Sequence, residues 1–293
     1  MKVLAKKAVH PGMPGRKVLD LVDLFLFLVD ARIPGTSVRL ASPYLSRKKR
    51  VYVLAKPDLA DPLMTARWTS AFAAEGTSAF AVDCRRGDGM DSLVRYIKER
   101  KEELDRKRPP GVTPRPIRLM LFGPPNAGKS SLANRLLGTT KAPFGARPGL
   151  TRGSHWLRGR GFLEVLDTPG VVDTSQVKGD ARMKLAAVWA LPETAYEAQE
   201  LASWLVQRTV IPVTAEGGED EAQAKAVAHL EDFGRRRGFL RQGGAVDLDR
   251  ASKAFIHAFR EGQIGGFTLE EPPVLGERAH IEKGEQHEGE QHE

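Results

Sequence analysis

The chain has 293 residues, of which 41% are hydrophobic and 28% charged, and this length and composition are typical of a folded protein of two domains. A single cysteine, Cys84, excludes a disulfide framework and a metal site built from several cysteines. No apolar run approaches the roughly 18–20 residues of a membrane span, and the basic N-terminal residues lack the apolar core of a secretion signal, so we expect a cytoplasmic protein.

The formal net charge is +8 at pH 7 and is unevenly distributed along the chain. Residues 270–293 contain eight acidic and two basic side chains, so residues 1–269 carry a net charge of +14. A chain this basic favours a polyanionic partner such as nucleic acid, because neutralising phosphates releases counterions. The alternative is a basic protein without such a partner. The polar C-terminal residues, which repeat GEQHE, predict a disordered acidic tail over 271–293.

Short apolar runs bounded by turn residues predict buried strands of a parallel sheet. In chain order these strands span 22–29, 51–55, 79–82, 117–122 and 162–166. Helical patterns over 63–74 and 93–106 lie between them, and the proline-rich stretch 108–116 predicts an extended linker. Alternating strands and helices indicate an α/β fold. A smaller all-helical domain should follow from about residue 179, with helices over 183–208, 220–237 and 249–261.

The strand predicted over 117–122 leads directly into GPPNAGKS at 123–130, and a helical pattern follows. The spacing G-x-x-x-x-G-K-S between a strand and a helix is typical of a phosphate-binding P-loop. Backbone N–H groups and the helix N-terminus would surround the phosphates, Lys129 would approach the β- and γ-phosphates, and the Ser130 hydroxyl would bind Mg²⁺. The expected nucleotide contacts in this loop are Asn126, Ala127, Gly128, Lys129, Ser130 and Ser131.

The strand predicted over 162–166 ends in DTPG, which is a D-x-x-G motif. Close to a P-loop, Asp167 would hold Mg²⁺ through a water molecule, and the Gly170 N–H would contact the γ-phosphate. Thr151, in the intervening RPGLT segment, is a candidate contact of Mg²⁺ and the γ-phosphate, the alternative being an ordinary loop threonine. Lys129, Thr151 and Gly170 are therefore the residues expected to act on the transferred phosphate.

The residues that would recognise a guanine base precede the P-loop in the chain. The strand over 51–55 ends in AKPD, in which Lys56 and Asp58 match part of the N-K-x-D pattern whose carboxylate reads the guanine edge. The strand over 79–82 is followed by Asp83 and Cys84, where a backbone N–H is placed to contact the base oxygen. A circular permutation produces this order, because one sheet still brings the base and phosphate elements together.

On these motifs the chain resembles the circularly permuted ribosome-assembly GTPases of the YlqF/RbgA type. The resemblance covers residues 8–270 and rests on LVDLFLFLVDARIPGTS, LAKPDLAD, FGPPNAGKSSLANRLLG, ARPGLTRG, LEVLDTPGVV and GGAVDLDRASKAFIHAFREGQIGGF. It implies a permuted GTPase domain over 1–178 and a helical RNA-binding domain over 179–270. It also implies a monomer that hydrolyses GTP to GDP and phosphate, slowly without ribosomal particles, as a switch on ribosomal RNA in the precursor of the large ribosomal subunit.

Four positions bear on how far the resemblance extends to mechanism. Ala55 stands where the family has the Asn of N-K-x-D, so guanine specificity should weaken but survive the loss of a contact worth about 1–3 kcal/mol. Met13 stands where relatives have a histidine proposed to assist hydrolysis; His10 is a candidate replacement or a plain surface histidine. Val171 occupies the position of the water-orienting Gln of Ras-like enzymes, so unassisted hydrolysis should be slow. Asn126 is a candidate K⁺ ligand or a residue that only shapes the loop.

Two other functions remain open on the sequence alone. An RNA-binding module with a structural nucleotide and negligible turnover would fit Ala55, Met13 and Val171. An ATPase of loosened base specificity is disfavoured by Asp58, because a carboxylate would face the N1 lone pair of adenine. In the helical domain the candidate RNA contacts are Arg235, Arg236, Arg237 and Arg241, the alternative being a solvated helix end.

Overall fold

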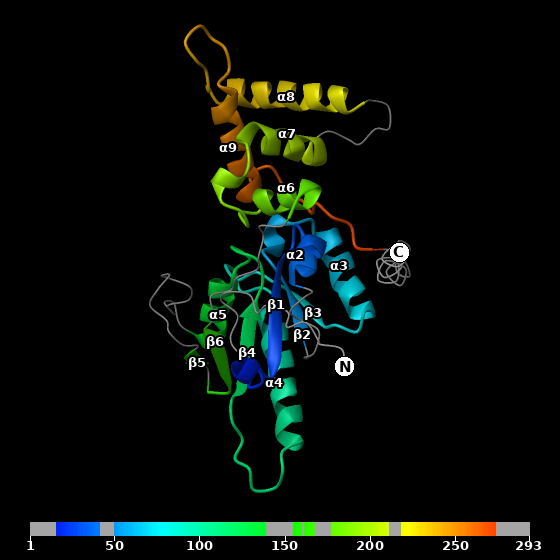
Figure 1. Ribbon diagram of the computed structural model, residues 1–293, viewed down its shortest axis with the longest axis vertical. Coiled ribbons are helices and arrows are strands. Elements are labelled where there is room, and N and C mark those ends of the chain that lie inside the picture. Colours follow the sequence, from blue (N-terminus) through cyan, green and yellow to red (C-terminus); the bar gives the residue numbers. More distant parts are fainter. Residues whose placement is uncertain are drawn as a thin grey trace, which may run out of the picture.

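The computed structural model describes residues 16–41, 50–138, 155–159, 161–167, 177–210 and 218–273. An α/β layer and a helical layer follow each other along the long axis of the molecule (Figure 1). Five residues weighed above, His10, Met13, Thr151, Gly170 and Val171, lie outside the described residues, as does the chain beyond residue 273. Within the described residues, no helix combines the length and the apolar character needed to cross a membrane.

Six strands of the described chain form one sheet in the order β3-β2-β1-β4-β6-β5. Their bounds are Leu24–Asp30 (β1), Arg50–Ala55 (β2), Ala79–Val82 (β3), Ile117–Phe122 (β4), His155–Gly159 (β5) and Leu163–Asp167 (β6). Neighbouring strands are parallel except β5, which runs antiparallel to β6 at the edge. Strands β1–β3 form one half of the sheet and β4–β6 the other, and the halves meet where β1 pairs with β4. The predicted α/β class and permuted order are confirmed.

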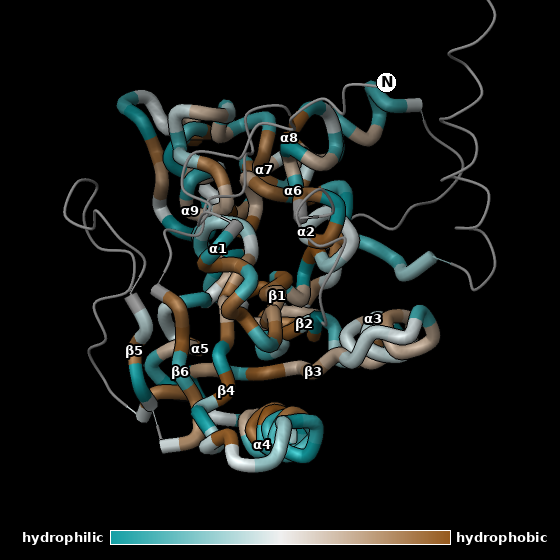
Figure 2. The backbone as a smooth tube through the Cα atoms, turned by 60° about the horizontal axis from the view of Figure 1, so that its bottom comes forward, coloured by the Kyte–Doolittle hydropathy of each residue, from teal (hydrophilic) through white to brown (hydrophobic). Residues whose placement is uncertain are grey.

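Both faces of the sheet are covered, which is why its inner strands β1, β2 and β4 are largely apolar runs. The flanking helices are α1 (Arg16–Leu19), α2 (Pro34–Ala41), α3 (Pro62–Ala74), α4 (Met90–Arg106) and α5 (Lys129–Leu137). Along β1, Leu24 and Leu26 face α4 and α5, whereas Phe25 and Phe27 pack with α2 and α3. Seen nearly end-on in Figure 2, α4 is hydrophobic on one side and hydrophilic on the other, as expected of a helix that buries one face.

The helical layer has its own apolar core, which continues into the α/β layer. Its elements are α6 (Gly179–Ala187), the short 3₁₀ turn η3 (Glu193–Ala195), α7 (Ala198–Thr209), α8 (Glu219–Arg236) and α9 (Leu248–Arg260). Leu185, Leu205, Leu230 and Phe255 bring one buried side chain from each helix into this core, and Ile33 joins them from the loop after β1. The two layers are therefore joined by buried apolar contact as well as by the chain.

The prediction of one continuous helix over 183–208 is wrong. Helix α6 ends at Ala187, Trp189 adopts a left-handed backbone conformation with φ 64°, and Pro192 follows soon after. Proline disfavours helical geometry in the residue before it, and the sequence analysis overlooked this signal. Arg260, only 4% exposed, donates from Nη2 to the Ala186 carbonyl at 2.6 Å and from Nε to the Ala187 carbonyl at 3.1 Å. A side chain from α9 thus satisfies the last carbonyls of α6.

Strand β5 was not predicted, because HWLRG is short and mixes polar with apolar residues. Its position depends on pairing with β6, from His155 opposite Asp167 to Gly159 opposite Leu163. Gly159 also lies against α5, since a Cβ there would be 2.5 Å from the Leu137 Cα. The other predicted strands and helices are present, with ends that differ by a few residues.

We predict that Arg260→Met lowers the free energy of unfolding by about 2–4 kcal/mol, because the Ala187 carbonyl and the Tyr196 hydroxyl lose this donor, and the Ala186 carbonyl keeps only the Trp189 N–H. Urea unfolding followed by tryptophan fluorescence measures the change. Arg95→Met, at an exposed position of α4, is the matched control and should change stability by less than about 0.5 kcal/mol. An Arg260→Met protein as stable as the wild type would contradict this account of the break between α6 and α7.

Candidate nucleotide site

Three loops enclose a cavity of about 310 Å³ at the carboxyl ends of β2, β3 and β4. In open parallel sheets, ligands bind at this edge, where the strand order reverses. The expected base contacts that line the cavity are Lys56, Asp58, Asp83 and Cys84. The expected phosphate contacts that line it are Asn126, Gly128, Lys129, Ser130 and Ser131, while Ala127 is buried at 1% exposure. The sheet therefore brings both groups to one cavity despite their order in the chain.

The phosphate loop owes its shape to residues with positive φ. Gly123 has φ 154°, and a Cβ there would lie 2.4 Å from the carbonyl oxygen of Leu28, so the close approach to β1 requires glycine. Asn126 and Gly128 are also left-handed, with φ 58° and 94°. Helix α5 starts directly after Gly128, so its free N–H groups are placed for an anion in the cavity.

Lys129 carries a positive charge that no carboxylate among the described residues neutralises. Its Nζ donates to the carbonyl oxygens of Gly123 at 2.9 Å and Pro124 at 2.6 Å. Burial, and then the nearby charge of Lys56, lowers the pKa of Lys129 to about 8. A bound phosphate would oppose both effects, because it supplies the missing negative charge.

The first base loop turns sharply at Lys56 and then forms the 3₁₀ turn η2 (Pro57–Leu59). Lys56 has φ 56°, and its Nζ lies 3.1 Å from the Asp30 Oδ2. Asp58 is exposed and lines the cavity. The lysine is thus anchored to the body of the protein, and the carboxylate that follows it is presented to the cavity.

Asp30, at the end of β1, forms a buried charge cluster that the sequence analysis missed. Its carboxylate accepts from Arg32 Nε at 2.8 Å and Nη2 at 2.9 Å, in addition to Lys56. Burial opposes ionisation, but Arg32 and then Lys56 outweigh it and hold the pKa of Asp30 well below its usual range. The available signal was an acidic and a basic residue placed directly after the apolar run LFLFLV.

The second base loop is organised by its own aspartate and by a helix of the phosphate side. The Asp83 carboxylate, 3% exposed, accepts from the backbone N–H groups of Arg85 at 2.7 Å and Arg86 at 3.2 Å. Arg135 of α5 donates to the carbonyls of Cys84 at 2.8 Å and Arg85 at 2.5 Å. Burial, and then Asp83, raises the pKa of the Cys84 thiol to about 11, so it stays protonated. No local pattern in LANRLL marks Arg135, so its role is visible only in the fold.

The residues of the cavity fit a magnesium ion that is held mainly by a nucleotide. Among the described residues, no group of three or more His, Cys, Asp or Glu side chains converges. Mg²⁺ at phosphate sites needs only one or two protein ligands, with water and phosphate oxygens as the rest. Ser130 offers an exposed hydroxyl at the start of α5. Asp167 ends β6, which pairs with the P-loop strand β4 through Leu166 opposite Met120, so its backbone is near the same edge.

The phosphate loop also touches the helical layer. Asn126 Nδ2 donates to the Trp189 carbonyl at 2.5 Å, across the boundary between the layers. The guanidinium of Arg260 lies 4.8 Å from the centre of the Trp189 ring. The amide considered above as a K⁺ ligand is therefore engaged in an interlayer contact in this structure.

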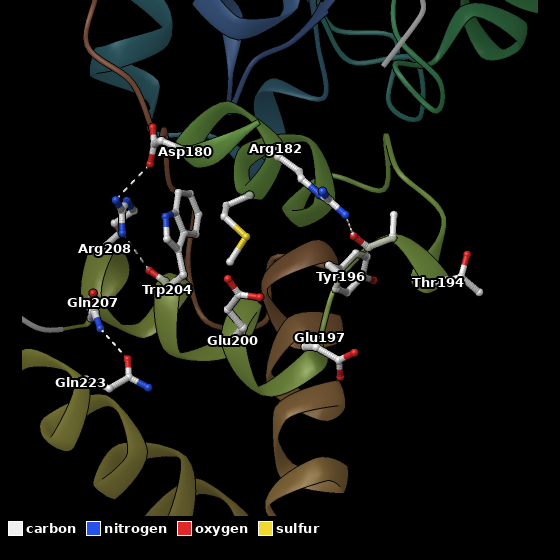
Figure 3. A pocket seen from close by; sticks show the side chains of 13 residues that line it. Asp180, Arg182, Thr194, Tyr196, Glu197, Glu200, Trp204, Gln207, Arg208 and Gln223 are labelled. Atoms are coloured by element: carbon white, nitrogen blue, oxygen red, sulfur yellow. Dashed lines mark hydrogen bonds and ion pairs between the residues drawn. The ribbon is translucent and has the colours of Figure 1, made fainter. Parts of the chain in front are cut away.

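A second cavity of about 770 Å³ lies within the helical layer and contains none of the expected nucleotide residues (Figure 3). Both acidic and basic side chains line it. Asp180 forms an ion pair with Arg208 at 3.0 Å, and the Arg208 guanidinium lies 4.0 Å from the centre of the Trp204 ring. Gln207 and Gln223 bond to each other across α7 and α8 at 3.1 Å. The smaller cavity is the candidate nucleotide site, because the predicted phosphate and base loops converge only there among the described residues.

Comparison with known proteins identifies the family. A family model described as 50S ribosome-binding GTPase matches residues 118–229. Ribosome biogenesis GTPase A of Priestia megaterium is 35% identical over 261 residues, which cover 87% of this chain and 91% of the relative. The chain belongs to the ribosome biogenesis GTPase A family. The same family includes a protein of Thermotoga maritima that is 28% identical over 257 residues, covering 88% of this chain and 89% of the relative.

Solved structures of this family have the same architecture. GDP-bound YlqF matches with a TM-score of 0.64 at 26% identity, covering 88% of this chain and 98% of that one. GNP-bound YlqF from T. maritima matches with a TM-score of 0.63 at 26% identity, covering 89% and 97%. The resemblance inferred from the motifs is thereby confirmed, and the chain is a GTPase with a permuted α/β domain and a helical domain.

Nucleotide binding should be coupled to proton uptake by Lys129. At pH 8.5 about half or more of the free protein has a neutral Lys129, and phosphate oxygens will raise its pKa, so GDP binding should take up a fraction of a proton and weaken as pH rises further. Titration calorimetry in buffers of different ionisation enthalpy measures the uptake. At pH 7 the free protein is already protonated, and the uptake should fall towards zero.

Lys129→Arg is the matched variant for this prediction, because a guanidinium keeps its charge across the same pH range. GDP binding to this variant at pH 8.5 should therefore take up fewer protons than binding to the wild type, because residue 129 is charged before and after binding. Equal uptake by the wild type and the variant would contradict the assignment of the titrating group.

Proposed function

We propose that this protein is a GTP-hydrolysing assembly factor that acts on the precursor of the large ribosomal subunit as a nucleotide-dependent switch on ribosomal RNA. The observation that carries the nucleotide part is the convergence of Asp58, Asp83 and the P-loop on one cavity. The names of the relatives and the description of the family model support the ribosomal part. The net charge of +14 over residues 1–269 supports an RNA partner.

At the phosphates, we propose that Lys129 binds the β- and γ-phosphates and that Ser130 binds Mg²⁺, with Asp167 acting through water and Thr151 and Gly170 contacting the γ-phosphate side. The ion would neutralise charge that develops on the transferred phosphate. The apolar Val171 side chain cannot hydrogen-bond and orient a water molecule, which supports slow hydrolysis without a ribosomal particle. His10 and a K⁺ ion at Asn126 remain candidate contributors to that step.

At the far end of the helical layer, we propose an RNA contact built on arginines that aromatic rings hold in place. The α8–α9 loop lies at the end of the molecule remote from the sheet (Figure 1). Arg237 stacks 4.5 Å from the centre of the Phe233 ring, and Arg250 lies 4.5 Å from that of Phe239. Stacking limits the rotamers of these side chains, so less entropy is lost when they bind phosphates.

Communication between the two ends would pass through the interlayer contact of the P-loop. Asn126 is bonded to the Trp189 carbonyl, and Trp189 is packed under Arg260 of α9. A nucleotide or cation that draws the Asn126 amide into the cavity would break this bond. We propose that this competition, together with the direct connection from the D-x-x-G segment to α6, links nucleotide state to the orientation of the helical layer.

GDP should bind at least about tenfold more tightly than ADP, a difference of about 1.4 kcal/mol. A competition titration against a fluorescent nucleotide in KCl and Mg²⁺ measures both affinities. Asp58→Asn should remove most of the preference, because an amide cannot accept from both donors of the guanine edge. Asp88→Asn, at an exposed position of the neighbouring loop, is the control and should keep it. Equal binding of GDP and ADP by the wild type would sink the guanine assignment.

Large ribosomal particles should raise the rate of GTP hydrolysis by at least about tenfold, as expected of a GTPase that lacks its own water-orienting group. The double variant Arg237→Gln/Arg250→Gln should bind these particles more weakly and with a shallower salt dependence, while its GDP affinity stays unchanged. Phosphate release and co-sedimentation measure the two effects. Negligible turnover with and without particles would instead favour an RNA-binding module with a structural nucleotide.

A further inference from the structure

The chain after α9 does not extend the helical layer but returns to the α/β layer. Residues 262–270, which we name the strap, pass from the end of α9 towards α2 and α3 (Figure 1). Gly266 comes so close to the first base loop that a Cβ would lie 2.6 Å from the Ala60 carbonyl oxygen. A Cβ at Gly262 would lie 2.9 Å from the Leu59 side chain. The strap is therefore packed against the residues that directly follow Asp58.

Hydrogen bonds attach the strap to the base loop and to the end of β1. The Phe267 N–H donates to the Leu59 carbonyl at 3.2 Å, and the Leu269 N–H donates to the Arg32 carbonyl at 2.8 Å. The Thr268 hydroxyl accepts from the Asp61 N–H at 3.2 Å and donates to the Ala31 carbonyl at 3.4 Å. One hydroxyl thus bridges the base loop to the segment after Asp30.

A buried carboxylate anchors the far end of the strap. The Glu270 side chain is 5% exposed and accepts from the Thr36 N–H at 3.1 and 3.0 Å and from the Thr36 hydroxyl. Lys184 of α6 supplies a counter-charge at 3.3 Å, and the Trp68 indole donates to the Glu270 backbone carbonyl at 3.2 Å. These donors satisfy the hydrogen-bonding capacity of the carboxylate and hold the strap in one position.

The base loop needs support from outside because Ala55 has no side chain that can bond across it. Its Cβ only reaches van der Waals distance of the P-loop, 3.8 Å from where a Cβ on Gly128 would lie. Lys56 is tied to Asp30 on one side of the loop. On the other side, Leu59 and Asp61 are tied by backbone to the strap.

We propose that the strap is a specificity element that positions Asp58 for guanine, in place of the polar side chain that Ala55 lacks. This inference rests on the proposed guanine site. Thr268 and Glu270 are positioning residues, since neither lines the nucleotide cavity and they act through the base loop. The strap should affect recognition of the base edge more strongly than the binding of phosphates.

Thr268→Val in the full chain tests the proposal, because it removes the bridging hydroxyl and nearly keeps the volume. Affinities for GDP and for IDP, which lacks the 2-amino group that Asp58 would read, are measured by competition. GDP affinity should fall about fivefold and the GDP-to-IDP ratio at least about threefold. Thr209→Val removes a hydroxyl that donates to a backbone carbonyl within α7 and should leave both values unchanged.

Glu270→Gln gives a second test, with Glu271→Gln at the exposed neighbouring position as its control. Glu270→Gln should lower the GDP-to-IDP ratio, whereas Glu271→Gln should not. The thermal unfolding midpoint without nucleotide is recorded for each variant. A variant that stays folded at the assay temperature shows that a lower GDP-to-IDP affinity ratio does not result from unfolding.

The outcomes separate the strap from the guanine site itself. If the wild type binds GDP and IDP equally, the proposal that Asp58 recognises the guanine 2-amino group is wrong, and the strap proposal is wrong as well. If the wild type prefers GDP and both strap variants keep that preference, only the strap proposal is overturned. An equal loss of GDP and IDP affinity would also overturn it, because the strap would then support the loop without affecting base choice.

Discussion

Asp30 is a carboxylate that the fold removes from water and that stays ionised because Arg32 and Lys56 approach it. An isolated buried charge would be strongly unfavourable, so the three side chains must be placed together. These side chains connect different parts of the fold. Asp30 ends β1 and Lys56 begins the base loop. Arg32, two residues after Asp30, contacts α9 through the carbonyl of Arg260 at 3.5 Å and the face of Phe259. The charge cluster around Asp30 therefore connects the sheet, the base loop and the helical layer.

In the nucleotide cavity, by contrast, a positive charge lacks a carboxylate partner among the described residues. Lys129 is partly buried near Lys56 and has only backbone carbonyls as partners among the described residues; its removal from water, and then the charge of Lys56, lowers its pKa. Gly123 and Gly128 allow the phosphate loop to fold closely around a ligand, and Arg135 holds the second base loop through the Cys84 carbonyl. A site arranged in this way is ready for an anion before it arrives, so little reorganisation is needed when phosphate binds.

The helical layer contributes to the same site at two separate places. Trp189 contacts the P-loop through Asn126, and the strap contacts the base loop through Leu59 and Thr268. Both contacts lead back to α9, because Arg260 packs on Trp189 and the strap is the direct continuation of that helix. A partner that moves α9 would thus act on the P-loop and the base loop together, and this is the route by which the proposed RNA contact at the distant α8–α9 loop would affect a bound nucleotide.

The strand and helix order, the P-loop and the permuted order of the motifs could be predicted from the amino-acid sequence, because these depend on residues close together in the chain. It did not predict β5, whose five residues become a strand only by pairing with β6, or the break after α6, which Arg260 completes from 73 residues away. Arg135 and the strap were likewise invisible, since their partners are distant in sequence. Only tertiary packing decides such contacts, because the energy of a buried hydrogen bond or ion pair depends on what folding brings beside it.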